Sequence, residues 1–75
     1  MAIDLKYGYL EIPGIADDEP VFVLRAQDDL ATQTIEDYIG WCEYEEVNPE
    51  HVEAADSARR AFCIWQETHA TRMPG

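Results

Sequence analysis

The chain has few basic residues. Five lysines and arginines stand against sixteen aspartates and glutamates in 75 residues, which gives a formal net charge of −11. A surface of that sign repels phosphate backbones and anionic membranes, so we expect no direct nucleic-acid partner and no membrane. The same charge attracts basic protein surfaces, or it only keeps a small protein soluble, and the sequence leaves both interpretations open.

Long apolar runs are also missing. No segment approaches the roughly 20 apolar residues of a membrane-spanning helix, and the start MAIDLKYGYLEI is too polar for a secretory signal peptide. We therefore expect a cytoplasmic protein. Its two cysteines, Cys42 and Cys63, are then expected to stay reduced and to act as small core residues.

The usual marks of a reaction centre are absent. The sequence has no glycine-rich phosphate loop, no paired-cysteine spacing and no cysteine beside a basic residue. His51 and His69 lie at opposite ends of one predicted helix, roughly 27 Å apart at the helical rise, so they cannot share a metal ion. We predict a protein that is not an enzyme and that has no cofactor and no metal site.

The length limits the core. A chain of 75 residues makes one domain and buries only about 60–65% of its unfolded surface. So small a core cannot hold all the large aromatic side chains. Those expected at the surface are Tyr7, Tyr9, Trp41, Tyr44 and Trp65. Because exposed aromatic residues often mark interfaces, we predict a homo-oligomer.

The residue pattern predicts an α+β fold in a single small domain, residues 1–75. An N-terminal β-hairpin, or two short strands, is expected within 7–26, because YGYLEI (7–12) and PVFVLRA (20–26) are rich in strand formers. The acidic segment 13–19 joins them. A two-stranded hairpin is not stable alone, so it should lie on the helices or on another subunit.

An antiparallel two-helix hairpin is expected after the strands, with helices at 29–47 and 49–68 and a loose tail at 70–75. Asp28 or Asp29 is the expected cap of the first helix, and Asn48-Pro49-Glu50 is a typical start of the second. Apolar residues recur at helical spacing on one face of each helix. On the first they are Ala31, Ile35, Tyr38, Ile39 and Cys42, and on the second Ala55, Ala58, Phe62 and Trp65.

Arg25 is one of the few cations, and it stands between a predicted strand and a predicted helix. A guanidinium and the free N–H groups of a helix start can together hold a phosphate. The alternative, which we favour, is an ion pair with Asp28, Asp29 or an acid of residues 17–19 that fixes the corner. The candidate ligand-binding residues are Arg25, Gln27, Asp28, Tyr7, Tyr9 and Trp41.

Two stretches, IPGIADDEPVFVLRAQDDLATQTIEDY and the ending WQETHATRMPG, resemble a group of small uncharacterised proteins of tailed bacteriophages and prophages. Members of that group carry an IPxDEPVFxxRAQD stretch, two helices and a C-terminal WQ motif. The resemblance covers most of the chain and matches it at Pro20–Phe22 and Arg25–Asp28. It implies a viral protein in the host bacterial cytoplasm, and it implies no activity. The last residues differ from the Asn-Pro-containing tail of the group.

Phage origin implies a function by binding. The first hypothesis is an anti-defence protein that sequesters a small nucleotide-like signal in pockets of a homo-oligomer. The second is an acidic inhibitor that docks on the basic nucleic-acid-binding groove of a host defence protein, as anti-CRISPR decoys do. The third is a structural or assembly component of the phage. The acidic face of the second hypothesis consists of Asp17, Asp18, Glu19, Glu36, Asp37, Glu43, Glu45 and Glu46.

Overall fold

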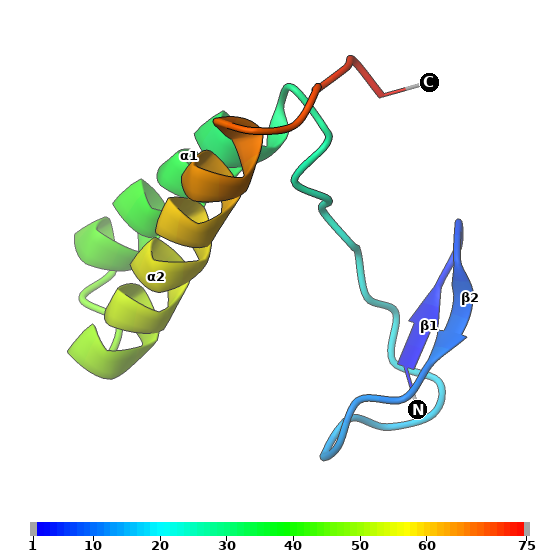
Figure 1. Cartoon of the computed structure of the whole chain (residues 1–75). Helices are drawn as coiled ribbons and strands as arrows, with labels where there is room; N and C mark the ends of the chain where they lie inside the picture. Colours follow the sequence, from blue (N-terminus) through cyan, green and yellow to red (C-terminus); the bar gives the residue numbers. More distant parts are fainter. Residues whose placement is uncertain (1, 75) are drawn as a thin grey trace.

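The computed structural model describes residues 2–74 and places two strands before two helices (Figure 1). The elements are β1 (Ala2–Asp4), β2 (Gly8–Leu10), α1 (Ala31–Tyr44) and α2 (Pro49–Gln66). The strands form an antiparallel hairpin and the helices pack on each other, which confirms the predicted α+β class. No helix within residues 2–74 is both long and apolar enough to cross a membrane.

The hairpin lies closer to the N-terminus than the predicted strands at 7–12 and 20–26. Its register pairs Ala2 with Leu10, Ile3 with Tyr9 and Asp4 with Gly8. Asp4 fixes this position, because its Oδ1 accepts hydrogen bonds from the backbone N–H groups of Lys6 and Tyr7, both at 2.8 Å. A short aspartate side chain closes the turn locally, so the two strands meet there and not across the acidic segment.

The predicted second strand is instead a linker, residues 20–28, which joins the hairpin to the helices and turns at Ala26 and Gln27 (Figure 1). One parallel bridge joins its start to Ile3, and in it the N–H of Val21 donates to the carbonyl of Ile3 at 2.8 Å. The N–H of Val23 then donates to Oδ2 of Asp4 at 3.0 Å. Because that amide binds a side chain and not a strand carbonyl, no ladder continues.

The start of α2 confirms the local prediction. The side chain of Asn48 accepts a hydrogen bond from the N–H of Glu50 at 2.9 Å, and Pro49 is the first helical residue. The start of α1 is partly as predicted. Asp28 accepts from the N–H of Leu30 at 2.7 Å, but the helix begins at residue 31 and has no side-chain cap of its own.

Both helices end before their predicted limits of 47 and 68. At the end of α1, Glu46 has a left-handed backbone with φ of 55°. Its N–H donates to the carbonyl of Glu43 at 3.2 Å, and the N–H of Val47 donates to the carbonyl of Cys42 at 2.9 Å. This is the Schellman pattern, which satisfies the last carbonyls and turns the chain away from the helix axis.

The predicted inward faces of the helices are largely observed. Ala31 and Cys42 of α1 are buried, and Phe62 of α2 is half-buried. Three positions of the expected stripes are exposed instead: Tyr38 on α1, and Ala58 and Trp65 on α2. The buried face of each helix is therefore narrower than the sequence pattern predicts.

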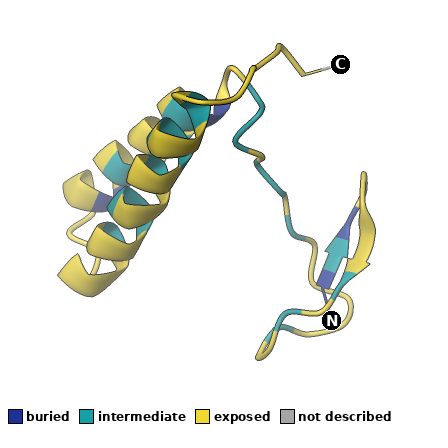
Figure 2. Ribbon diagram, in the orientation of Figure 1, coloured by how far each residue is buried: buried dark blue, intermediate teal, exposed yellow. Residues whose placement is uncertain are grey.

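Little of the chain is buried (Figure 2). Within residues 2–74 no large side chain is fully buried, and neither strand contacts either helix. The chain exposes 5816 Å², whereas a monomeric protein of 8.6 kDa exposes about 4,700 Å². Its radius of gyration is 13.8 Å, against about 11 Å for a compact domain of this length. The chain is therefore more open than an ordinary small monomeric protein.

Candidate ligand-binding site

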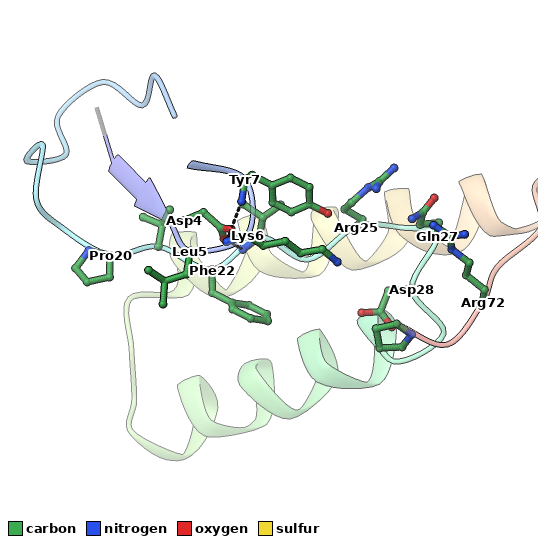
Figure 3. Close-up of a pocket in the computed structure, with 13 residues that line it drawn as sticks. Asp4, Leu5, Lys6, Tyr7, Pro20, Phe22, Arg25, Gln27, Asp28 and Arg72 are labelled. Atoms are coloured by element: carbon green, nitrogen blue, oxygen red, sulfur yellow. Dashed lines mark hydrogen bonds between the residues drawn. The ribbon is translucent and has the colours of Figure 1, made fainter. Parts of the chain in front are cut away.

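A cavity of about 580 Å³ lies between the hairpin turn, the linker and the C-terminal tail (Figure 3). Its wall comes from three separate parts of the sequence, so the fold is needed to assemble it. The residues that line it are Asp4, Leu5, Lys6, Tyr7, Pro20, Val21, Phe22, Val23, Arg25, Gln27, Asp28, Arg72 and Pro74.

Backbone hydrogen bonds hold the linker in place beside this cavity. The carbonyl of Ala26 accepts from Nε2 of Gln66 at 2.9 Å, which joins the linker to the end of α2. The carbonyl of Gln27 accepts from the N–H of Arg72 at 2.8 Å, and the N–H of Asp29 donates to the carbonyl of Arg72 at 2.9 Å. The expectation of a loose tail is therefore wrong at Arg72, because both backbone groups of this residue are paired with the linker.

Arg25 does not form the expected ion pair. Within residues 2–74 its guanidinium has no carboxylate partner, so the favoured interpretation of a corner clamp is wrong. The corner is held by its neighbours: Ala26 and Gln27 through their carbonyls, and Asp28 through its carboxylate. In the RAQD segment the last three residues thus hold the chain, while the side chain of Arg25 lines the cavity.

Cations gather at this cavity. Lys6, Arg25 and Arg72 are three of the five basic residues of the chain, and all three line the cavity. None of them makes an ion pair in the described part of the chain. The remaining two, Arg59 and Arg60, are paired on α2 with Asp56 and Glu53. A strongly acidic protein thus places all its unpaired described cations at one site.

Two acids at the cavity have their own hydrogen bonds. Asp4 is 3% exposed, and the N–H of Tyr7, helped by those of Lys6 and Val23, holds the pKa of its carboxyl below the ordinary value against the opposing effect of burial. The carboxylate of Asp28 accepts from the N–H of Leu30. Three cations and two carboxylates leave the cavity with an excess of one positive charge.

The structure brings together four of the six predicted binding residues. Arg25, Gln27, Asp28 and Tyr7 all line the cavity, and Figure 3 shows Arg25 between the hairpin turn and the Gln27–Arg72 side. Tyr9 lies on β2 outside the lining, and Trp41 lies on α1 beside a second hollow. The sequence prediction missed nine of the thirteen lining residues, among them Lys6, Arg72 and Phe22.

The predicted acidic face is divided into two regions. Glu36, Asp37, Glu43, Glu45 and Glu46 are exposed on α1 and at its end. Asp17, Asp18 and Glu19 are exposed in the loop that follows the hairpin, at the end of the linker away from the helices (Figure 1). A partner surface therefore meets one acidic region or the other, and the single face that the sequence predicts is not formed.

Comparison with protein families, curated proteins and solved structures gave no match to this chain. Within residues 2–74 no group of three or more His, Cys, Asp and Glu side chains is placed to hold a metal ion. The class of the protein is therefore described from its structure alone. It is an open α+β protein whose hairpin turn, linker and C-terminal tail form a cavity lined by cations.

Proposed function

We propose that this chain is a non-enzymatic binding protein that holds a small, anionic, nucleotide-like ligand in the cavity. The observation that carries the proposal is the gathering of Lys6, Arg25 and Arg72, without ion-pair partners in the described chain, around one cavity. Guanidinium groups bind phosphate oxygens through two parallel N–H donors, and an ammonium group adds a point charge. A net charge of −11 makes this local excess of cations unexpected by chance alone.

The other lining residues suit a ring attached to the anion. Tyr7 offers an aromatic ring, and Gln27 offers an amide that both donates and accepts. Ligand sites of known proteins occupy about 300–1,000 Å³ and combine apolar walls with a few polar groups. A cavity of about 580 Å³ falls in that range. A nucleotide-like molecule suits this lining, because its phosphate matches the cations and its base matches the aromatic and amide groups.

Binding without chemistry is the mode that the side chains support. Cys42 is buried in α1, Cys63 is half-buried in α2, and neither lines the cavity. His51 contacts the hydroxyl of Tyr38 at 2.7 Å, and His69 stacks on Trp65, both away from the lining. In an infected bacterium such a protein would act by sequestration, lowering the free concentration of a defence signal. The resemblance to phage proteins supports this role.

Titration calorimetry with a panel of anions tests the proposal. The panel consists of pyrophosphate, mononucleotides, ADP-ribose and cyclic dinucleotides. Arg25→Gln and Arg72→Gln should each weaken binding roughly 10- to 100-fold, because each removes a charge-assisted hydrogen bond of about 1.5–3 kcal/mol. Arg60→Gln is the matched control, since it makes the same change of charge outside the cavity. An absence of binding across the panel, or an equal loss in Arg60→Gln, rejects the proposal.

A second hollow favours the alternative of an acidic inhibitor. It lies on α1 and is lined by Glu36, Asp37, Gly40, Trp41 and Tyr44. Carboxylates beside exposed aromatic rings suit arginine and lysine side chains of a basic protein surface. In that case Glu36→Gln with Asp37→Asn should abolish capture of the basic partner, whereas Arg25→Gln should leave it unchanged. If Arg25→Gln abolishes capture and the Glu36→Gln with Asp37→Asn variant does not, the partner binds at the cavity and not on α1.

A further inference from the structure

An uncovered apolar rim stands at the mouth of the cavity. Leu5 is 95% exposed and Phe22 is 84% exposed, although both line the cavity. The hairpin that carries Leu5 has two strands of three residues each and contacts neither helix. So small a sheet is not stable without support from another element. Within residues 2–74 the hairpin is supported along one edge, where the linker bridges to Ile3, and it has no helix packed on it.

The amount of uncovered surface matches the size of a subunit interface. The exposed area of 5816 Å² exceeds the value for a monomer of this mass by about 1,100 Å². Stable protein interfaces bury about 800 Å² on each partner. The chain therefore exposes as much additional surface as one or two contacts with another molecule would cover.

A complementary surface exists on the same chain. The hollow on α1 is bordered by Trp41 and Tyr44, which are 66% and 77% exposed. Gly40 also lines it, and no atom lies within 4 Å of the position that a side-chain Cβ would take there. The hollow is shallow and open to solvent, so a large apolar side chain of another molecule can reach it from outside.

We propose that a second copy of this chain covers the rim, with Leu5 and Phe22 of each copy seated in the α1 hollow of the other. Exchange of the same two surfaces closes a symmetric dimer. Charge favours this pairing over contact between two hairpins. Two hairpins would bring the cation Lys6 toward its own copy, whereas the hollow presents the carboxylates of Glu36 and Asp37. The second copy also forms the missing wall of the cavity.

Light scattering on the full chain tests this dimer. We expect a mass of two chains, and Phe22→Ser and Gly40→Leu should each raise the dissociation constant roughly 30-fold or more, as the loss of a central aromatic contact does. Phe22 is so exposed that its replacement leaves the protomer intact. Ala54→Leu, which adds bulk at an exposed position of α2 outside both surfaces, is the control. A monomeric wild type, or variants that associate as well as the wild type, overturns the inference.

Cross-linking identifies the surfaces that meet. In a background of Cys42→Ala and Cys63→Ala, Phe22→Cys combined with Gly40→Cys should give a disulfide-linked dimer, and Phe22→Cys alone should give none. A dimer linked through Phe22→Cys alone places hairpin on hairpin and refutes the arrangement.

The inference does not depend on the proposed ligand. Arg25→Gln with Arg72→Gln should leave the mass unchanged, so failure of the dimer and failure of anion binding are separate results.

Discussion

The bond between Gln66 and the linker allows a sharp test of how the site is held. Nε2 of Gln66 donates to the carbonyl of Ala26 at 2.9 Å, which joins residues forty positions apart. The linker contains Arg25. In the described chain this is the one hydrogen bond that a helix side chain makes to the linker. Gln66→Glu keeps the shape of the side chain and replaces the donor with an acceptor. Two oxygens then face each other in a half-buried position.

The size of the effect follows from the lost bond and the new repulsion. A hydrogen bond contributes about 0.5–1.5 kcal/mol net, and an unsatisfied buried partner costs about 1–3 kcal/mol. We expect Gln66→Glu to lower the free energy of unfolding by about 1–3 kcal/mol. For a chain of this size each kcal/mol shifts the Tm by about 4–8 °C. Anion binding should weaken as well, because the linker that positions Arg25 is released.

Thermal unfolding followed by circular dichroism measures the change. The matched control is Gln33→Glu, which makes the same substitution at an exposed position in the first turn of α1. A carboxylate at that helix start stabilises by about 0.3–1 kcal/mol, so the control should move the Tm slightly upward. The two variants carry the same net charge, and their difference reports the contact with Ala26.

The pH dependence supplies the refuting result. The neutral form of the introduced carboxyl can donate to the Ala26 carbonyl, so its pKa rises above the ordinary value of about 4.3 for a glutamate. The penalty of Gln66→Glu is therefore present at neutral pH and shrinks as the pH falls through the raised pKa. Gln33→Glu should show no such recovery. Equal stability of the two variants at neutral pH would show that the Gln66 bond does not hold the linker.

Three further outcomes are expected at the turns of the chain. Glu46→Gly should stabilise the protein by about 0.5–1 kcal/mol in urea unfolding, because glycine adopts a φ of 55° without strain; a loss of stability contradicts the Schellman assignment. Asp4→Asn should leave Oδ1 for the amides of Lys6 and Tyr7 but place a donor against the N–H of Val23, so hydrogen exchange should accelerate at Val23 first. Because the pKa of Asp4 is lowered in the fold, its contribution is present above about pH 4 and lost as the pH falls through the lowered pKa; the amide signals of the hairpin should show this acid transition in the wild type and not in Asp4→Asn.

The sequence predicts the elements whose causes are local. The adjacent residues Asn48 and Pro49 predict where α2 begins, and the helix begins there in the structure. The end of α1 lacks such a mark, because Glu46 takes a conformation that usually requires glycine. The strand formers at 20–26 are a true signal of extended backbone. They do not predict whether that segment pairs with another strand. It does not continue as a strand, because the N–H of Val23 donates to the side chain of Asp4 and not to a backbone carbonyl.

Four of the thirteen residues that line the candidate site are predicted from the sequence. Arg25 and its neighbours were found because they stand together in one motif. Lys6 and Arg72 were missed, because they lie 66 residues apart and meet only through the fold. A signal for these two residues is present: Arg59 and Arg60 have acids at helical spacing in α2, whereas Lys6 and Arg72 have no acid three or four residues away in the sequence. In a chain this acidic, such cations deserve to be grouped before the structure is known.

The two candidate partners differ in the sign of the salt effect on the association rate. An anion approaching a protein of net charge −11 is repelled at long range and is attracted only near the cavity. At 0.01 M salt the Debye length of about 30 Å is comparable to the dimensions of the molecule, 35 × 33 × 18 Å, so the whole charge acts. At 0.15 M salt that length is about 8 Å, and the approaching anion responds mainly to the nearby Lys6, Arg25 and Arg72.

The association rate of an anionic ligand, measured by stopped-flow fluorescence, should therefore rise with salt over this range. Docking on a basic protein groove predicts the opposite, since the same net charge then attracts the partner and salt weakens that attraction. A rate that falls with salt for the anion would mean that the cations do not form the entrance of the cavity.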